Sequence, residues 1–243
     1  SLTYTTAYQT EKDSFYVTVG LWQAGQNRIF IDCNVQSPAD MLSPGRIGMT
    51  AILPVRFTAM KWYGKGPLET YPDRQCGGRM GVYSEDVRNQ PFYLRPQEYG
   101  LHTESRSMRL TDPDRADFVR FEAACPMAMS AVPYSDLQLW NARHPPELPA
   151  PEALYVHLDY AHRGLGNSSC GPDALPTYRI DDRPCRFGFA LEAGLGERED
   201  NPFGPIPEEI PAYHPWKAVG EQDRTPSYRD PSDPDQRSNA GMV

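Results

Sequence analysis

Residues 154–172 read LYVHLDYAHRGLGNSSCGP, and this stretch indicates both the fold and the region where function is to be sought. Its first half places an apolar residue at every second position: Leu154, Val156, Leu158 and Tyr160. A two-residue apolar period is typical of a β-strand with one buried face. The second half is a loop dense in Gly, Asn, Ser and Cys. Polar loops anchored on rigid strands are where binding chemistry is usually placed.

The same alternation recurs along most of the chain. It is clearest at residues 29–35, 47–53 and 187–191, and residues 3–9, 15–24 and 118–123 are also strand-like. Many strands separated by Gly, Pro and Asp turns predict an all-β sandwich of antiparallel sheets. Alternating strand–helix units are missing from the sequence, which excludes a Rossmann fold and a (β/α)₈ barrel in these residues.

One short helix is predicted to begin just after Ser135. Ser135 and Gln138 have the spacing of a capping box, in which each side chain bonds to the backbone of the other residue. Leu139 and Trp140 follow, and the Pro145-Pro146 pair ends the helix.

The overall composition restricts the partners of the chain. The 243 residues carry a net charge of −8 without a run of Lys or Arg, which argues against nucleic acid and against anionic membrane surfaces. No apolar stretch approaches the roughly 20 residues that cross a bilayer. The five cysteines are widely spaced and form no C-x-x-C motif. We therefore expect mostly reduced, buried thiols in a cytoplasmic protein.

The last part of the chain differs in character. Residues 192–243 are rich in Pro, Glu, Asp and Gly, and we expect an extended tail that packs on the domain or on a neighbouring subunit. The domain itself is predicted to span residues 1–191. Because the sequence begins inside a strand-like segment, we expect this domain to be truncated at its N-terminus.

Residues 62–67, WYGKGP, combine aromatic side chains with glycines that permit tight turns. The aromatic rings could stack on a sugar, as they do in many carbohydrate sites. The alternative, which we favour, is that Trp62 and Tyr63 belong to the core or a strand edge. In that case Asp73 and Arg74 form a structural ion pair.

Two further groups of polar residues are candidates for chemistry. His157 and Asp159 share one face of their strand, and a nucleophile pair of a histidine with Cys170 is conceivable. Gly and Ser neighbours do not activate a thiol, so hydrogen-bonded structural histidines are the preferred interpretation. The second group could bind a sugar or form an internal charge network, and the sequence does not distinguish these roles; it consists of Glu98, His102, Glu104 and Arg106.

Taken in order, these motifs resemble the C-terminal domain of large bacterial β-galactosidases, in glycoside hydrolase family 2. Residues 62–74, WYGKGPLETYPDR, are similar to the family pattern W-x-G-x-G-P-x-E-x-Y-P-D-R. Residues 96–100 resemble its P-x-E-x-G segment, and residues 134–144 and 159–172 resemble its helix and its rim loop. The resemblance extends from about residue 3 to residue 191.

The resemblance implies a large antiparallel supersandwich, related in fold to galactose mutarotases. It implies an intact enzyme that hydrolyses terminal β-D-galactosyl residues with retention, a mechanism that needs two carboxyls roughly 5 Å apart. In this family both catalytic glutamates, and the ligands of Mg²⁺ and Na⁺, belong to a separate (β/α)₈ barrel. We therefore assign no catalytic residue, metal ligand or cofactor to this chain, and predict that it is inactive when isolated.

The resemblance also places the loop at the rim of the substrate cleft. The candidate contacts to the galactoside are His162, Asn167, Ser169 and Cys170. Cys170 stands where other members carry a Trp that stacks on the leaving group. The expected partners are the galactoside, the rest of the enzyme and further copies in a homo-oligomer.

Two alternative functions stay open at this point. One is a stand-alone carbohydrate-binding module. The other is an enzyme resembling aldose epimerases, with a Glu base and a His acid. For that chemistry the residues to inspect are Glu98, Glu104, His102 and His157.

Overall fold

The structure, a computed structural model, describes residues 1–9, 14–36, 44–91, 93, 98–166, 171–180 and 184–196. The predicted tail thus lies outside the described residues, apart from residues 192–196. The described residues form β1 (Leu2–Gln9), β2 (Ser14–Gln23), β3 (Arg28–Gln36), β4 (Arg46–Pro54), β5 (Ala59–Gly66), β6 (Arg79–Asp86), η1 (Val87–Asn89), β7 (His102–Thr111), β8 (Phe118–Val132), α1 (Asp136–Asn141), η2 (Pro145–Glu147), β9 (Ala153–His162), η3 (Pro176–Tyr178) and β10 (Cys185–Gly194).

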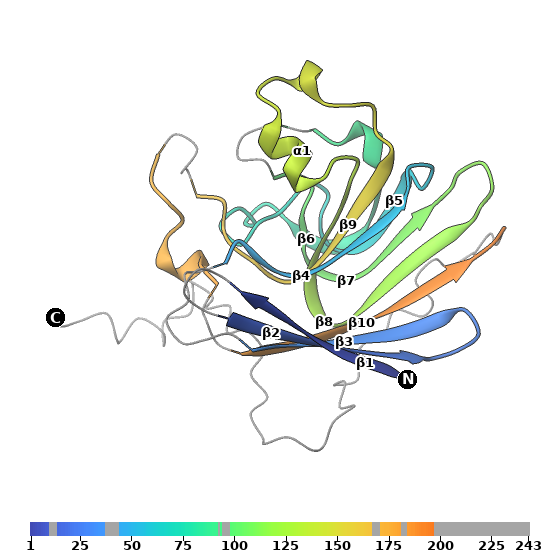
Figure 1. Ribbon diagram of the computed structural model, residues 1–243. Coiled ribbons are helices and arrows are strands. Elements are labelled where there is room, and N and C mark those ends of the chain that lie inside the picture. Colours follow the sequence, from blue (N-terminus) through green and yellow to red (C-terminus); the bar gives the residue numbers. More distant parts are fainter. Residues whose placement is uncertain are drawn as a thin grey trace. The chain divides into compact units, whose positions relative to one another are not determined.

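Every strand pairing among the described residues is antiparallel. The main path runs β1-β2-β3-β10-β8-β7-β5-β6, and β9 connects β8 to β4 (Figure 1). The single α-helix of the described part, α1, lies beside the β4–β9 pair. The predicted all-β, antiparallel fold class is confirmed. Strand β10 continues past residue 191 to Gly194. The division into a domain and a tail stays a prediction.

Strand β8 is where the sheet divides. Its first half, Phe118 to Ala123, pairs with β10, whereas its second half, Ala128 to Val132, pairs with β9. Pro126 lies between the two halves, at a position where a missing N–H breaks no pairing with either strand. The expected strand at 118–123 is thus only the first half of a strand that passes from one layer to the other.

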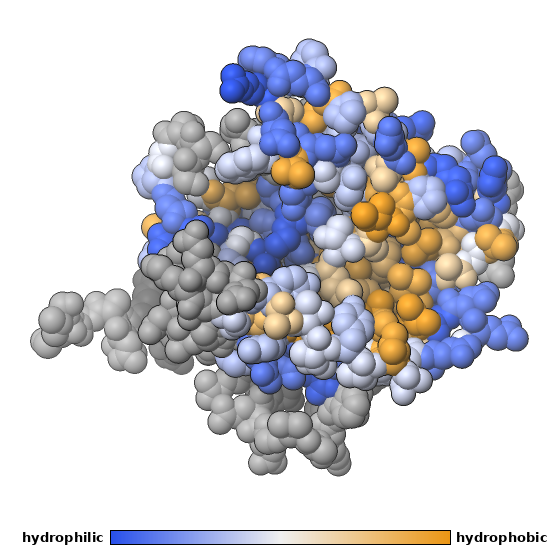
Figure 2. Space-filling model, in the orientation of Figure 1, coloured by the Kyte–Doolittle hydropathy of each residue, from blue (hydrophilic) through white to orange (hydrophobic). Residues whose placement is uncertain are grey.

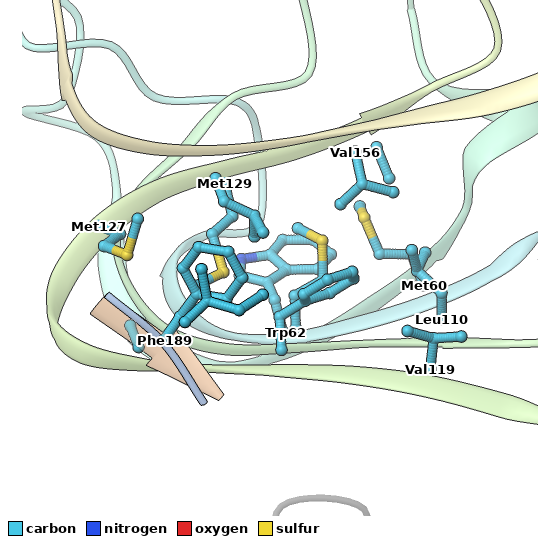
Figure 3. Close-up of a cluster of buried hydrophobic side chains, with 14 of the residues drawn as sticks. Met60, Trp62, Leu110, Val119, Met127, Met129, Val156 and Phe189 are labelled. Carbon is cyan, nitrogen blue, oxygen red and sulfur yellow. The ribbon is translucent and has the colours of Figure 1, made fainter. Parts of the chain in front are cut away.

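The core fills the space between the β4–β9 pair and the layer that contains β3 and β10. The thiol of Cys33 on β3 lies 3.2 Å from the Met49 sulfur on β4. Tyr160 of β9 stacks on Phe187 of β10 with ring centroids 5.6 Å apart. Figure 3 shows that Trp62 lies in this cluster, among buried side chains of several strands.

The segment WYGKGP does not form the tight turns that its glycines suggested. Gly64 and Gly66 lie within β5. A Cβ at Gly64 would be 2.9 Å from the Ser105 Cα, so glycine is needed for the close approach of the β7 backbone. The strand ends at Gly66, and the peptide bond between Gly66 and Pro67 is cis.

The predicted helix is present as α1. Ser135 Oγ accepts from Gln138 N (3.2 Å), and Gln138 Oε1 accepts from Ser135 N (2.8 Å), as expected for a capping box. The helix positions Asp136, its first residue, above the polar face of β9.

Candidate functional site

The polar face of β9 is buried, although the alternation predicted burial of only the apolar face. His157 and Asp159 both lie on this second face, and Asp159 is 1% exposed. Figure 2 shows hydrophilic residues gathered in a hollow below α1, whereas apolar residues gather on the right of the view, where Figure 1 draws β5, β7 and β8. A buried polar face needs internal partners for its polar atoms.

A β-bulge adds His162 to this face. Arg46 pairs with His162 and Gly48 pairs with Asp159, and the register shifts between Ile47 and Gly48. The extra residue on β9 reverses the side-chain alternation, so that His162 joins Asp159. Gly48 makes room for the buried carboxyl, because a Cβ there would be 2.3 Å from Asp159 Oδ1.

Arg46 is the centre of the cluster. Its guanidinium forms an ion pair with Glu98 and lies 2.6 Å from His157 Nδ1. It also lies 3.9 Å from the carboxylates of Asp159 and Asp136. An arginine that serves several acceptors in a buried setting offsets the cost of removing those charges from water.

His157 is held in the neutral state. Because arginine only donates hydrogen bonds, the contact with Arg46 requires Nδ1 of His157 to accept. Burial and the charge of Arg46 lower the pKa of His157 to about 4. The remaining proton is therefore on Nε2, which faces Asp136 at 3.7 Å.

His162, in contrast, favours the protonated state. Its Nδ1 donates to the Arg163 carbonyl at 2.6 Å, and its Nε2 lies 3.5 Å from Glu98 Oε2. Burial disfavours the charged ring, but the hydrogen bond to Glu98 and its charge raise the pKa of His162. Burial likewise acts against ionisation of Glu98, yet His162 and Arg46 lower the pKa of this carboxyl. Tyr71 also donates to Glu98, at 3.2 Å.

Asp159 is the least satisfied member. Its Oδ2 is buried and has no hydrogen-bond partner among the described residues. Burial raises the pKa of this carboxyl to about 7, and the attraction of Arg46 only partly opposes the rise. With Asp159 protonated and His157 neutral, the positive charges of Arg46 and His162 balance those of Glu98 and Asp136.

The structure separates the four residues of the predicted polar segment. Glu98 belongs to the Arg46 cluster, whereas His102 stacks on Trp62 with centroids 3.9 Å apart. Glu104 and Arg106 face each other at 3.8 Å on the partly exposed side of β7, and Glu104 has a φ of 55° at an irregularity of the strand. The carboxylate nearest to His102 is that of Glu85, at 3.5 Å, and not one of the predicted group.

The interpretation of Trp62 as a core residue is supported by its 1% exposure and by its Nε1 donating to the Lys65 carbonyl. The expected pair of Asp73 and Arg74 does not form. Arg74 pairs with Glu69, while Asp73 accepts from the backbone N–H groups of Leu165 and Gly166. Residues adjacent in sequence need not contact each other through their side chains. Here the turn directs the side chains of Asp73 and Arg74 to different partners.

Of the predicted rim residues, only His162 is described. Asn167, Ser169 and Cys170 lie outside the described residues. The side chain of His162 is 6% exposed and points into the Arg46 cluster. Within the described ranges, no group of three or more His, Cys, Asp or Glu side chains could hold a metal ion. No described helix has the length and apolar character needed to cross a membrane.

Arg46, Tyr71 and Asp136 were not among the predicted site residues. Arg46 stands at the start of an apolar strand, and Asp136 looks like an ordinary first-turn residue of a helix. These residues come together only because of the bulge in β9 and because other segments of the chain cover its polar face. No local sequence pattern predicts either feature. The one usable signal is Gly48, an isolated glycine inside a strand, which often marks a bulge.

The chain is similar to known β-galactosidases. Residues 2–191 match the family model described as the small chain of β-galactosidase. A β-galactosidase from Staphylococcus xylosus is 31% identical over 156 residues, and one from Arthrobacter sp. (strain B7) is 33% identical over 168 residues. These matches cover 63% and 65% of this chain but only 16% of each relative. Among solved structures, a protein of Escherichia coli K12 assigned as an aldose 1-epimerase aligns with a TM-score of 0.43 and 10% identity, covering 79% of this chain and 65% of that protein.

Proposed function

The chain belongs to the β-galactosidase small-chain family, and we propose that it forms the C-terminal domain of an enzyme that hydrolyses terminal β-D-galactosyl residues with retention. The observation that carries the proposal is the family match over residues 2–191. Because the matched region is only 16% of each of the two relatives above, the activity is proposed for the complete protein and not for this chain alone.

In this proposal the Arg46 cluster is structural and does not act on the sugar. A proton-transferring group must reach the reacting atoms of the substrate. Glu98, His157 and His162 instead contact Arg46 or one another inside the cluster. Burial and Arg46 lower the pKa of His157, whereas Glu98 raises the pKa of His162 against the effect of burial. The cluster would keep the end of β9 rigid where it leads into the loop.

The loop would then contribute the cleft rim, with Asn167, Ser169 and Cys170 as contacts to the galactoside. His162 would act through the Arg163 carbonyl and not by touching the sugar. The catalytic glutamates and the Mg²⁺ and Na⁺ ligands are proposed to belong to the (β/α)₈ barrel of the complete enzyme. Assembly with that barrel and into a homo-oligomer is part of the proposal.

A cytoplasmic location is proposed as well, and thiols that form no disulfide support it. Cys33, Cys76 and Cys125 are free cysteines. The expectation that the thiols are mostly buried is wrong: among the described cysteines Cys33 alone is buried, Cys76 is exposed, and Cys125 and Cys185 are half-buried. Cys76 lies in the turn before β6, where its side chain has no core to enter.

The test compares the complete β-galactosidase that carries this chain with the chain alone. We expect the complete enzyme to hydrolyse o-nitrophenyl β-D-galactoside, to ignore the α-anomer, and to release β-galactose first when followed by NMR. The pure chain should show no turnover. Failure of the complete enzyme would refute the proposed function. Turnover by the chain alone, abolished by Glu98→Gln, would refute the proposed division of labour.

A further inference from the structure

We propose that Asp73 is a positioning residue for the galactosidase reaction, because its carboxylate fixes the base of the loop that follows β9. This inference rests on the proposed function, in which that loop borders the substrate cleft. Asp73 itself touches no reacting atom in this proposal. It acts through the backbone of residues 164–166.

The contact is made by backbone groups far away in the sequence. Leu165 N donates to Asp73 Oδ1 at 3.1 Å, and Gly166 N donates to Oδ2 at 2.7 Å. These donors are 92 and 93 residues away from Asp73 in the chain. Two charge-assisted bonds to successive N–H groups fix both the position and the direction of the backbone.

The turn that carries Asp73 is itself held firmly. Backbone bonds join Tyr71 and Arg74 in both directions, at 2.8 and 3.4 Å, and the Tyr71 side chain is fully buried. Arg74 pairs with Glu69, whose other oxygen accepts from Gly100 N at 2.8 Å. The carboxylate of Asp73 is therefore presented from a rigid support.

The backbone of residues 164–166 packs closely against Asp73 and against residues 174–178. A Cβ at Gly164 would be 2.8 Å from Asp73 Cγ and 2.8 Å from Tyr178 Cβ. Gly166 has a φ of 58°, and a Cβ there would be 2.5 Å from the Ala174 nitrogen. Both positions thus need glycine, one for close approach and one also for its left-handed backbone.

The residues that follow the loop, 173–179, return to the backbone beside Gly164. Gly164 N donates to the Tyr178 carbonyl at 2.8 Å, and Arg179 Nε donates to the Ala174 carbonyl at 3.0 Å. Arg163 pairs with Asp173 across the base. Asp73 therefore lies beside the point where the outgoing and the returning segments meet, and its carboxylate holds the outgoing one.

The experiment uses the complete enzyme with Asp73→Asn, which keeps the shape but turns an amide NH₂ toward one of the two N–H donors. Two substrates are compared: o-nitrophenyl β-D-galactoside, whose leaving group is large, and β-D-galactosyl fluoride, whose leaving group has no surface for the rim. We expect kcat/KM for the nitrophenyl substrate to fall about tenfold, the order of one lost charge-assisted hydrogen bond. The value for the fluoride should stay within about twofold.

A structural role alone would lower both values together, and that outcome, or no change in either, would overturn the inference. If Asp73→Asn does not fold, Asp73→Glu decides, because it keeps the charge but displaces the oxygens; it should show the same split at smaller size. Asp86→Asn is the matched control, since Asp86 also accepts from a backbone N–H, that of Arg88, at the start of η1. A wild-type enzyme inactive on both substrates would instead refute the proposed function.

Discussion

Nη1 of Arg46 lies 2.6 Å from Nδ1 of His157, and this contact fixes which nitrogen of the His157 ring carries the proton. It makes His157 an acceptor and therefore neutral, while His162, on the same face, donates from Nδ1 to a carbonyl. Two histidines of one strand thus have pKa values displaced in opposite directions, lowered for His157 and raised for His162. Burial acts against the charged form of both rings. The charge of Arg46 lowers the pKa of His157 further, whereas the hydrogen bond and the charge of Glu98 outweigh burial at His162.

Replacing Arg46 should destabilise the protein strongly. Arg46→Met keeps the apolar stem but leaves Glu98 as a buried carboxylate with one fewer positive partner. Removing one member of a buried ion pair costs about 3 kcal/mol or more in free energy of unfolding. Urea denaturation at pH 7 measures this, and a loss below about 1 kcal/mol would mean that the cluster is not needed for stability.

Arg28→Met is the matched control for this substitution. Arg28 also pairs with two carboxylates, Glu122 at 2.8 Å and Glu192 at 3.5 Å. Its side chain is 33% exposed and that of Glu122 is 41% exposed, so water screens the pair. The expected loss is under about 1 kcal/mol.

Removing the cap of α1 should have a smaller effect. Ser135→Ala leaves the Gln138 N–H without its acceptor at the first turn, which costs about 1 kcal/mol of stability. Ser84→Ala, on the exposed side of edge strand β6, should change stability by less than about 0.5 kcal/mol. Thermal unfolding of the two variants beside the wild type checks the difference; equal melting temperatures would show that the capping box contributes nothing.

The sequence predicted those features that depend on local pattern. The apolar alternation of β9 was sufficient to identify the strand and its core face, and the Ser135 capping box was sufficient to place α1. Both follow from contacts between residues close in the chain. Asp73 illustrates the limit, because its true partners are 92 and 93 residues away and no local rule points to them.

The grouping of Glu98 with His102 failed for a related reason. The two residues are close in sequence, but His102 is the first residue of β7 and turns to the Trp62 side, whereas Glu98 precedes the strand and turns to Arg46. The burial of the polar face of β9 was missed as well. A buried ionic face has the same sequence pattern as a solvated one, and only the covering elements distinguish them.

Substituting Gly166 should test how tightly the loop base is built. Gly166→Ala places a side chain at a φ of 58° with its Cβ 2.5 Å from the Ala174 nitrogen. This nitrogen is a backbone atom, so relieving the clash requires the neighbouring chain to move with it. Left-handed strain and the clash together should cost about 3 kcal/mol, or a melting temperature lower by about 6 to 12 °C. Gly77→Ala is the control, since nothing lies within 4 Å of its added Cβ and its φ carries no such strain. Equal melting temperatures for the two variants would contradict the described base.

The last prediction concerns pH and the buried carboxyl of Asp159. Burial raises its pKa from the ordinary 3.8 to about 7, although Arg46 acts in the opposite direction. A carboxyl whose folded-state pKa is raised binds its proton more tightly in the folded state. Its contribution to stability is therefore fully present below about pH 4 and is lost as the pH rises to about 7. His157 changes in the opposite sense, because its lowered pKa of about 4 makes stability rise with pH until the unfolded ring has lost its proton.

Because these two effects oppose each other, the wild type alone is a poor reporter, and the comparison with Asp159→Asn isolates the carboxyl. Asn resembles the protonated acid in shape and has no proton to lose. The variant should therefore gain stability relative to the wild type as the pH rises from about 4 to 7, by at most about 1.4 kcal/mol per pH unit, and the difference should stay constant above pH 7. Urea denaturation at half-unit intervals measures it, with Asp86→Asn as the control, because the hydrogen bond from Arg88 lowers the pKa of that carboxyl, against slight burial. The lowered pKa of Asp86 confines its effect to pH values below about 4, so the difference between this control and the wild type should not change between about pH 4 and 7. A difference between Asp159→Asn and the wild type that does not depend on pH would show that Asp159 ionises normally, and the charge balance proposed for the Arg46 cluster would then be wrong.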